Sequence, residues 1–401
     1  MGNRSTYKIL ALWDSVMWGQ WLEHDDKFVH IIADTLEKKS TDVSVSATIL
    51  AHSGANLDEN QTEKTEWKKH PYLYGELPRS RPNTVTQAHI ARLESDYLDW
   101  LSHDTFDFSS SINHKDTIKE ECKNFATTNP NLVLVNGAIN NFNAMQILLP
   151  VSMTQLSNAC KEKNIITAVT KLMDSLDFTE SEFKSKAKKC CYTTMLDTLV
   201  AVWNLYPNSQ IVTPGYYPLF SEKSCDAGSN DIAAFIIMLY AAATPDLCDN
   251  IIFFSFLVAM CINKKIFAER SKLWVDESNK WLKKACEDAN TKLNTNRFHF
   301  VAVSFWSKAA FTDGGFVFDI EIGKIKSFSD FENFGVDDDM KKNRKAAWDL
   351  YYPNTKSDTE WTAAKDYRAS IGHPNKKGSQ QYATDILNYI TKHQKQFWIT
   401  L

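Results

Sequence analysis

The chain has 401 residues, of which 43% are hydrophobic, so it can form one large domain with insertions or two domains. Its 45 lysines and arginines nearly balance 49 aspartates and glutamates, which gives a formal net charge of −4. No whole-chain field therefore favours nucleic acid or an anionic membrane as a partner.

The amino terminus, MGNRSTYK, has no apolar core of a secretory signal, which predicts a cytoplasmic protein. Gly2 and Thr6 match the loose pattern for N-myristoylation, so lipidation at Gly2 is an alternative. The eight cysteines are scattered, without a CxxC pair or the Cys/His spacing of a zinc site. We expect reduced structural thiols.

A short apolar run at residues 8–12 (KILAL) is typical of a parallel strand covered on both faces, and a helix-like pattern follows Ser15. Ligands of open parallel sheets bind outside the carboxyl ends of the strands, and helix N–H groups can stabilise a developing oxyanion. Ser15 is therefore a candidate nucleophile. The alternative is that Asp14 or Ser15 only caps the helix, since both residue types are preferred at that position.

Further elements alternate along the chain. Spacing and composition predict helices over residues 25–38, 84–101, 148–163 and 169–189, and strands over residues 42–50, 131–136, 209–215 and 297–303. Strands that alternate with helices indicate an open parallel α/β sheet.

Two segments interrupt this alternation. Residues 57–83 are polar, with several Pro, Gly and Tyr, and we expect a long loop that walls the ligand end of the sheet. Residues 232–243 and 251–262 are apolar, but each run is shorter than the roughly 20 residues that span a bilayer, so we expect no transmembrane segment. Buried helices inserted at about 218–290 are the simplest interpretation, and an apolar lid or acyl-chain pocket is the alternative.

Small or amide-rich turns follow two predicted strands, and a histidine lies in a loop near the other end of the chain. Gly54 lies after the second strand, in HSGAN, and Asn140 after the third, in GAINN. His373 occupies a Gly/Pro-rich loop just before a helix predicted over 379–389, where its side chain can act as a general base. The alternative is an ordinary surface or turn histidine.

These four stretches, taken in order from residue 9 to residue 389, resemble the SGNH hydrolases, also called the GDSL esterase/lipase family. The resemblance implies a single domain with a three-layer α/β/α, flavodoxin-like fold around a five-stranded parallel sheet. The family motifs correspond here to Trp13-Asp14-Ser15, to Gly54, to 138–141 with Asn140, and to 370–374 with His373.

The resemblance implies a serine esterase or lipase that needs no metal or organic cofactor and acts on a small-molecule ester or acylated substrate. Ser15 attacks the ester carbonyl, His373 takes its proton, and the N–H groups of Ser15 and Gly54 with the Asn140 amide form the oxyanion hole. The family covers lipids, thioesters and acetylated sugars.

Four motif positions depart from the family pattern: Trp13, Ala138, Asn141 and Ser370 replace Gly, Gly, Asp and Asp. We expect Trp13 and Asn141 to contact substrate, with Trp13 narrowing the pocket. Ser370 or Asp366 must orient His373, and loss of the orienting carboxylate from a serine triad can lower turnover by about 10⁴.

Two other functions are considered. A non-catalytic binding module on the same fold would explain the four replaced positions. A nucleotide-binding α/β protein is disfavoured, because neither G-x-G-x-x-G nor G-x-x-x-x-G-K-[ST] follows a predicted strand. The oligomeric state is open.

Overall fold

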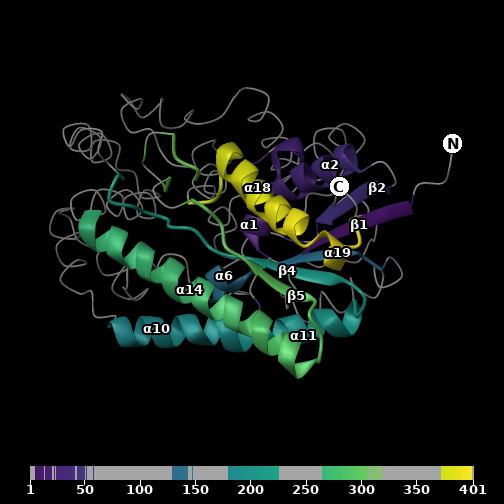
Figure 1. Ribbon diagram of the computed structural model, residues 1–401. Coiled ribbons are helices and arrows are strands. Elements are labelled where there is room, and N and C mark those ends of the chain that lie inside the picture. Colours follow the sequence, from purple (N-terminus) through teal and green to yellow (C-terminus); the bar gives the residue numbers. More distant parts are fainter. Residues whose placement is uncertain are drawn as a thin grey trace, which may run out of the picture.

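The computed structural model describes residues 5–12, 14–19, 22, 24–40, 43–49, 51, 57, 129–142, 147, 179–224, 264–305, 308–309, 312, 314–317 and 372–399. Within these ranges, a five-stranded sheet lies between two layers of helices (Figure 1). The predicted helices over 84–101 and 148–163, the body of the 57–83 loop and the apolar runs at 232–243 and 251–262 lie outside the described residues, and the single-domain assignment stays a prediction.

All five predicted strands are present, and every neighbouring pair is parallel. Their order is β2-β1-β3-β4-β5, which is the flavodoxin-like order. The strands are β1 (Ser5–Leu12), β2 (Val43–Ile49), β3 (Leu132–Val135), β4 (Gln210–Pro214) and β5 (Phe298–Val301). The three-layer α/β/α fold class is thereby confirmed.

Burial along the strands follows their place in the sheet. β3 and β4 are buried at every residue, as expected for central parallel strands covered on both faces, whereas the edge strand β2 is mostly half-exposed. The register pairs Leu12 with Val135 and Pro214 with Val301. The carboxyl ends of these strands therefore meet at one edge of the sheet, where the candidate site lies.

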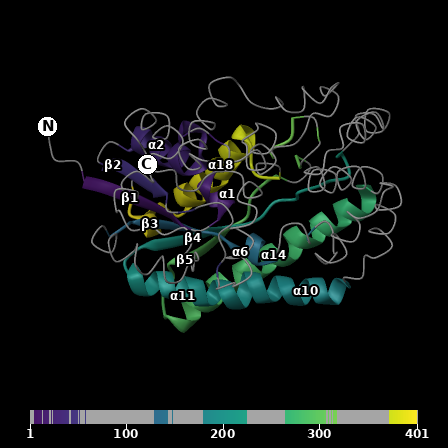
Figure 2. The same cartoon turned by 180° about the vertical axis from the view of Figure 1, so that it is seen from behind.

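One helix layer comes from the two ends of the chain. It contains η1 (His24–Asp26), α2 (Phe28–Lys39), α18 (Lys376–Lys392) and α19 (Gln394–Phe397). The rings of Phe28 and Tyr382 stack with centroids 5.1 Å apart, which joins α2 to α18. Figure 2 shows this layer from behind.

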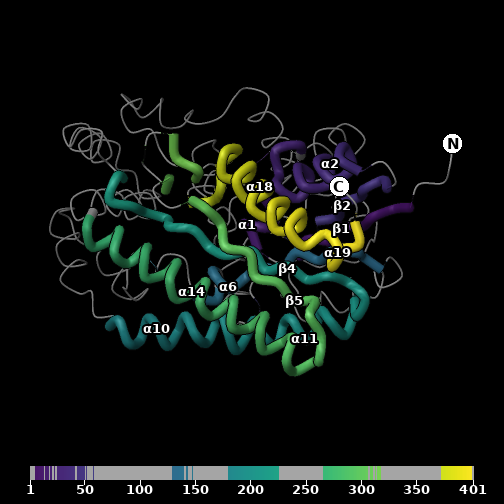
Figure 3. Tube along the Cα trace, viewed as in Figure 1, coloured from purple at the N-terminus to yellow at the C-terminus, as the bar shows by residue number. Residues whose placement is uncertain are grey.

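The opposite layer contains α10 (Glu180–Lys188), the π-helical segment η4 (Lys189–Thr194), α11 (Met195–Leu205) and α14 (Lys264–Lys292). In Figure 3, α14 runs beside α10 and α11, away from α18. The helix predicted over 169–189 does not end there, because η4 and α11 continue it to Leu205.

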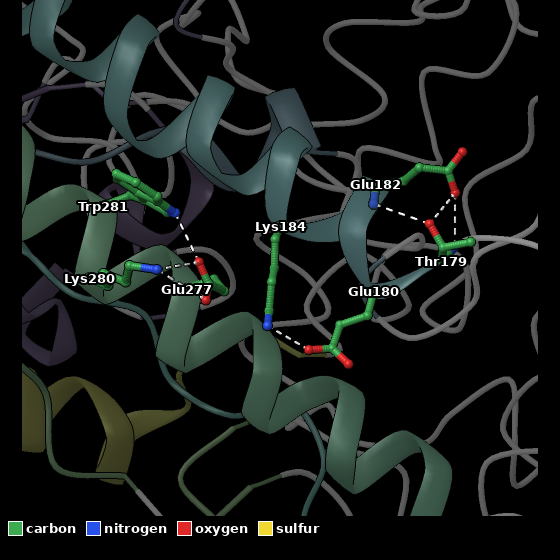
Figure 4. Close-up of polar contacts among 7 residues, drawn as sticks. All are labelled: Thr179, Glu180, Glu182, Lys184, Glu277, Lys280 and Trp281. Atoms are coloured by element: carbon green, nitrogen blue, oxygen red, sulfur yellow. Dashed lines mark hydrogen bonds and ion pairs between the residues drawn. The ribbon is translucent and has the colours of Figure 1, made fainter.

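Polar contacts order the outer surface of this layer (Figure 4). Thr179 caps α10 in a reciprocal capping box, in which its Oγ1 accepts from the Glu182 N–H at 3.2 Å and Glu182 Oε2 accepts from the Thr179 N–H at 2.8 Å. On α14, the Glu277 carboxylate accepts from Trp281 Nε1 at 2.9 Å and from Lys280 Nζ at 3.1 Å. The capping box of α10 lies at the exposed surface, whereas the Glu277 carboxylate on α14 is buried.

Two further findings bear on the sequence expectations. Cys190, Cys191 and Cys286 are buried free thiols, as expected for reduced structural cysteines, and the other five lie outside the described residues. No helix in the described ranges is long and apolar enough to span a membrane.

Candidate active site

Ser15 and His373 meet at the carboxyl edge of the sheet, although 358 positions separate them in the chain. Ser15 Oγ lies 2.6 Å from His373 Nε2, which is hydrogen-bonding distance. Ser15 is the first residue of α1 (Ser15–Trp18), directly after β1, and His373 lies just before α18. The fold therefore brings the two candidate residues together, whereas their catalytic roles stay a prediction.

The turn that carries Ser15 is held by its neighbours. Asp14 is the helix cap, and its Oδ1 accepts from the N–H groups of Val16 and Met17, each at 3.1 Å. Gly19 ends α1 after one turn with a positive φ of 69°, and a Cβ there would lie 2.9 Å from Lys27 Cγ. Asp14 thus has the capping role, which leaves the Ser15 hydroxyl available for His373.

The Asp14 carboxyl is completely buried. Burial raises its pKa to about 6, against the opposing effect of the hydrogen bonds from Met17, Tyr216 and Val16. The Tyr216 hydroxyl donates to Asp14 Oδ2 at 3.2 Å. The Asp14 carboxyl therefore takes up a proton at a higher pH than an exposed aspartate does, and each of its oxygens accepts a hydrogen bond.

The loop that carries His373 is fixed on both sides. Gly372 has a φ of +83°, a conformation that favours glycine, and its carbonyl accepts from the Tyr217 hydroxyl at 2.7 Å. After the histidine, Pro374 pairs with Val317 in an isolated antiparallel bridge. The backbone on either side of the imidazole is thus anchored to other parts of the chain.

Asn375 extends this anchor into α18. Its Oδ1 caps the helix by accepting from the N–H groups of Lys377 and Gly378, at 2.9 and 3.1 Å. Its Nδ2 donates to the carbonyls of Gly315 and Val317, at 2.9 and 3.1 Å. The cap also explains why the helix predicted from residue 379 begins at Lys376.

Tyr216 and Tyr217, directly after β4, were not among the residues proposed from the sequence. Tyr216 reaches α6 (Ala138–Phe142) as well as Asp14, because its hydroxyl accepts from the Ile139 N–H at 2.9 Å. The sequence signal was a pair of aromatic residues at the carboxyl end of a buried strand, which by itself indicates core packing as readily as a site.

The remaining candidates are placed only in part. Asn141 Oδ1 accepts from the Leu57 N–H at 2.7 Å, so it joins α6 to the chain after β2. The Asn140 backbone lies in α6, while its side chain is outside the described part of the structure. The same holds for all atoms of Trp13, Gly54, Ser370 and Asp366, so the orienting group and most of the oxyanion hole stay predictions.

No group of three His, Cys, Asp or Glu residues that could hold a metal ion occurs among the described side chains. The polar groups gathered at the strand ends include the Ser15 hydroxyl, the His373 imidazole and the Asp14 carboxyl that caps α1. Such an arrangement can carry out nucleophilic chemistry when a base takes the hydroxyl proton.

Comparison with known proteins finds similarity to solved structures alone. No protein-family model and no curated protein sequence matches it. Among solved structures, it is similar to an extracellular lipase from Streptomyces rimosus, at 10% identity and a TM-score of 0.40 over 96% of this chain and 99% of that chain. The sheet and its two helix layers define a three-layer α/β/α protein.

Two carbohydrate-active esterases are also similar in structure. A family two carbohydrate esterase from Clostridium thermocellum, solved with cellohexaose, matches at 11% identity and a TM-score of 0.36, over 98% of this chain and 66% of that chain. An acetyl xylan esterase from the rumen bacterium Butyrivibrio proteoclasticus matches at 11% identity and a TM-score of 0.32, over 99% and 66%. The chain spans slightly less than two thirds of either esterase.

Proposed function

We propose that the protein is a serine hydrolase of carboxylic esters, with Ser15 as nucleophile and His373 as general base. The observation that carries the proposal is the 2.6 Å contact between Ser15 Oγ and His373 Nε2. At this distance the imidazole can accept the hydroxyl proton directly. The strand order supports the further proposal that the chain is a distant member of the SGNH hydrolases.

The reaction has two stages. Ser15 Oγ forms a bond to the ester carbonyl carbon while its proton moves to His373 Nε2, and the alcohol then leaves with that proton. A water molecule, deprotonated by His373, attacks the acyl-serine and releases the carboxylic acid and free Ser15. Every step uses only ester, water and these two side chains.

The carbonyl oxygen gains negative charge in both stages and needs donors. Within the described part of the chain, the Ser15 N–H meets no hydrogen-bond acceptor, which leaves it available to an oxyanion. The Gly54 N–H and the Asn140 amide are the further proposed donors. Removal of one such donor costs about 3 to 4 kcal/mol of barrier in other serine hydrolases.

We further propose roles for the residues around Ser15 and His373. Ser370 or Asp366 orients His373, and Trp13 and Asn141 contact a small-molecule acyl ester.

A binding module on this fold is the second candidate. It is favoured by the low exposure of Ser15, of which 3% is accessible. The contact with His373 counts against it, since an inactive relative has no need of a base within reach of the serine. Chemical reactivity separates the two candidates.

The test is labelling by a fluorophosphonate probe with intact-mass detection, together with turnover of short- and medium-chain p-nitrophenyl esters. Ser15→Ala and His373→Ala should abolish both, whereas Ser185→Ala, at an exposed serine of α10, should leave both unchanged. A folded wild type that neither labels nor turns over any ester would favour the binding module.

A further inference from the structure

Two consecutive tyrosines hold the separate parts of the candidate site. The Tyr216 hydroxyl donates to Asp14 Oδ2 at 3.2 Å and accepts from the Ile139 N–H at 2.9 Å. The Tyr217 hydroxyl donates to the Gly372 carbonyl at 2.7 Å. Asp14 caps the helix that begins with Ser15, and Gly372 precedes His373, so both partners of the 2.6 Å contact are reached from one dipeptide.

The backbone that carries these tyrosines cannot shift easily. The Gly215 N–H donates to the Val301 carbonyl and the Gly215 carbonyl accepts from the Tyr382 hydroxyl, both at 2.8 Å. Asn279 accepts from the Tyr216 N–H at 2.7 Å and donates to the Tyr216 carbonyl at 3.1 Å. The dipeptide is thereby fixed to β5, α18 and α14.

Asn279 can approach the Tyr216 backbone closely because the residue before Tyr216 is a glycine. A Cβ at Gly215 would lie 2.6 Å from Asn279 Oδ1, so a larger residue there would displace the amide. The two hydrogen bonds between Asn279 and the Tyr216 backbone therefore require the glycine of the sequence Pro-Gly-Tyr-Tyr at the end of β4.

We propose that Tyr216 and Tyr217 are positioning residues whose hydroxyls together set the distance and angle between Ser15 and His373. This inference rests on the proposed hydrolase function. Tyr216 acts on the nucleophile through the cap of α1, and Tyr217 acts on the base through the carbonyl that precedes it. Because the two tyrosines are consecutive and their backbone is held in place, the position of the Ser15 turn is fixed relative to that of the His373 loop.

The competing interpretation is that the tyrosines only fill the core. Their rings do pack, with centroids of Tyr216 and Trp274 5.1 Å apart and those of Tyr217 and Phe305 4.7 Å apart. Phenylalanine keeps this packing and removes only the hydroxyl, so Tyr216→Phe and Tyr217→Phe separate the two interpretations. Tyr7→Phe is the matched control, because the buried Tyr7 hydroxyl meets no hydrogen-bond partner among the described residues.

The experiment measures the rate and the endpoint of fluorophosphonate labelling, with kcat and KM for a p-nitrophenyl ester. Each site variant should lower kcat and the labelling rate about tenfold or more, because a small misplacement of reacting groups is costly. KM should stay within about twofold and the labelled fraction should reach the wild-type value. Tyr7→Phe should change every quantity by less than about twofold.

These readouts separate positioning from stability. A residue needed only for folding would lower the labelled fraction, because part of the protein would be inactive, and would leave the rate of the active part unchanged. Wild-type rates in both Tyr216→Phe and Tyr217→Phe would overturn the proposal.

Second variants keep the test decisive if a phenylalanine variant does not fold. Gly372→Ala strains the backbone at φ +83°, yet its Cβ would meet its nearest atom, Leu219 Cδ2, at an ordinary 3.6 Å. Asp14→Asn keeps a capping oxygen but presents an amide where Tyr216 needs an acceptor. Both should slow labelling at an unchanged endpoint, and wild-type rates in both would overturn the proposal.

A wild type without labelling or turnover would defeat the proposed function and leave the geometry to be tested. The imidazole ¹⁵N signals of His373, identified by their loss in His373→Ala, should shift in Ser15→Ala because the 2.6 Å contact is broken. The same shift in Tyr217→Phe would support positioning, and wild-type signals there would overturn it.

Discussion

The Asp14 carboxylate and the Tyr216 hydroxyl form a buried hydrogen bond of 3.2 Å beside the candidate nucleophile. The acid belongs to the turn after β1 and the phenol to the turn after β4, so the bond ties two strand ends together across β3. Ionising the buried carboxyl costs free energy, so the stability of the folded protein depends on pH through the fraction of Asp14 that is ionised.

The first prediction concerns this charge. Burial raises the Asp14 pKa to about 6, above the unfolded value near 3.9, so the folded state binds the proton more tightly. The stability that the neutral acid contributes is present below about pH 4 and is lost as the pH rises through 6. The free energy of unfolding of wild type relative to Asp14→Asn should therefore fall by about 2 kcal/mol between pH 4 and pH 7. Chemical denaturation across this range measures the difference, and a flat difference would contradict the buried charge.

The second prediction concerns His299, whose titration changes stability with pH in the opposite direction to that of Asp14. His299 on β5 has its Nε2 2.8 Å from Gln210 Oε1, and burial, with a smaller effect from His393, lowers its pKa from 6.5 to about 4. The folded state therefore disfavours the proton, so stability is full above about pH 6.5 and is lost as the pH falls through 4. Relative to His299→Gln, wild type should lose on the order of 2 kcal/mol between pH 6.5 and pH 4.

His299 and Asp14 titrate in overlapping pH windows, so the two variants control for each other. The same denaturation series should give wild-type differences that slope in opposite directions for Asp14→Asn and His299→Gln. Slopes of the same sign would show that one of the two burial effects is absent.

The third prediction concerns Gly378 in the first turn of α18. A Cβ there would lie 2.0 Å from the Phe316 carbonyl oxygen, so Gly378→Ala should destabilise the protein by 2 kcal/mol or more, about the cost of overpacking, despite the better helix propensity of alanine. Lys377→Ala, at the exposed neighbouring position, should stay within about 0.5 kcal/mol of wild type. Thermal denaturation of both variants tests this, and equal melting temperatures would contradict it.

The fourth prediction separates the two roles of Asn375. Asn375→Asp keeps an oxygen that caps α18 but loses the amide protons given to Gly315 and Val317. Asn375→Ala loses both and should cost about 1 to 3 kcal/mol. Because the bonds to Gly315 and Val317 hold the His373 loop, ester turnover should fall in both variants. The helix cap should be lost only in Asn375→Ala, and hydrogen exchange of the Gly378 amide measures that loss. Protection of Gly378 in both variants would contradict the capping role.

The strands could be predicted from the sequence because each signal is contained within a few residues: a short apolar run for β1 and β3, and an alternating pattern for β2. The same holds for Ser15 and His373, which were picked out by what surrounds them, a strand end for one and a Gly/Pro-rich loop before a helix for the other. Their contact could not be derived locally, since it depends on two loops meeting at the same sheet edge.

The roles of Tyr216 and Tyr217 could not be predicted from local sequence patterns, because their hydrogen-bond partners are distant in the chain. Their hydroxyl partners Asp14 and Gly372 lie 202 and 155 positions away, and nothing within the stretch Pro-Gly-Tyr-Tyr names them. The helix α14 falls almost wholly within the helical insertion expected at about 218–290, but its own bounds were not predicted. Its buried residues recur at helical spacing among many charged ones, so no continuous apolar run marks where this helix begins and ends.

The contact between Ser15 and His373 has a consequence for biosynthesis. Ser15 is synthesised before His373, because it precedes His373 by 358 positions in the chain. A nascent chain that has not reached His373 therefore contains the Ser15 hydroxyl without the imidazole that contacts it in the folded protein, and the proposed mechanism predicts that such a chain does not attack esters. Under the proposed mechanism, Ser15 gains its base only when α18 and the loop before it have docked.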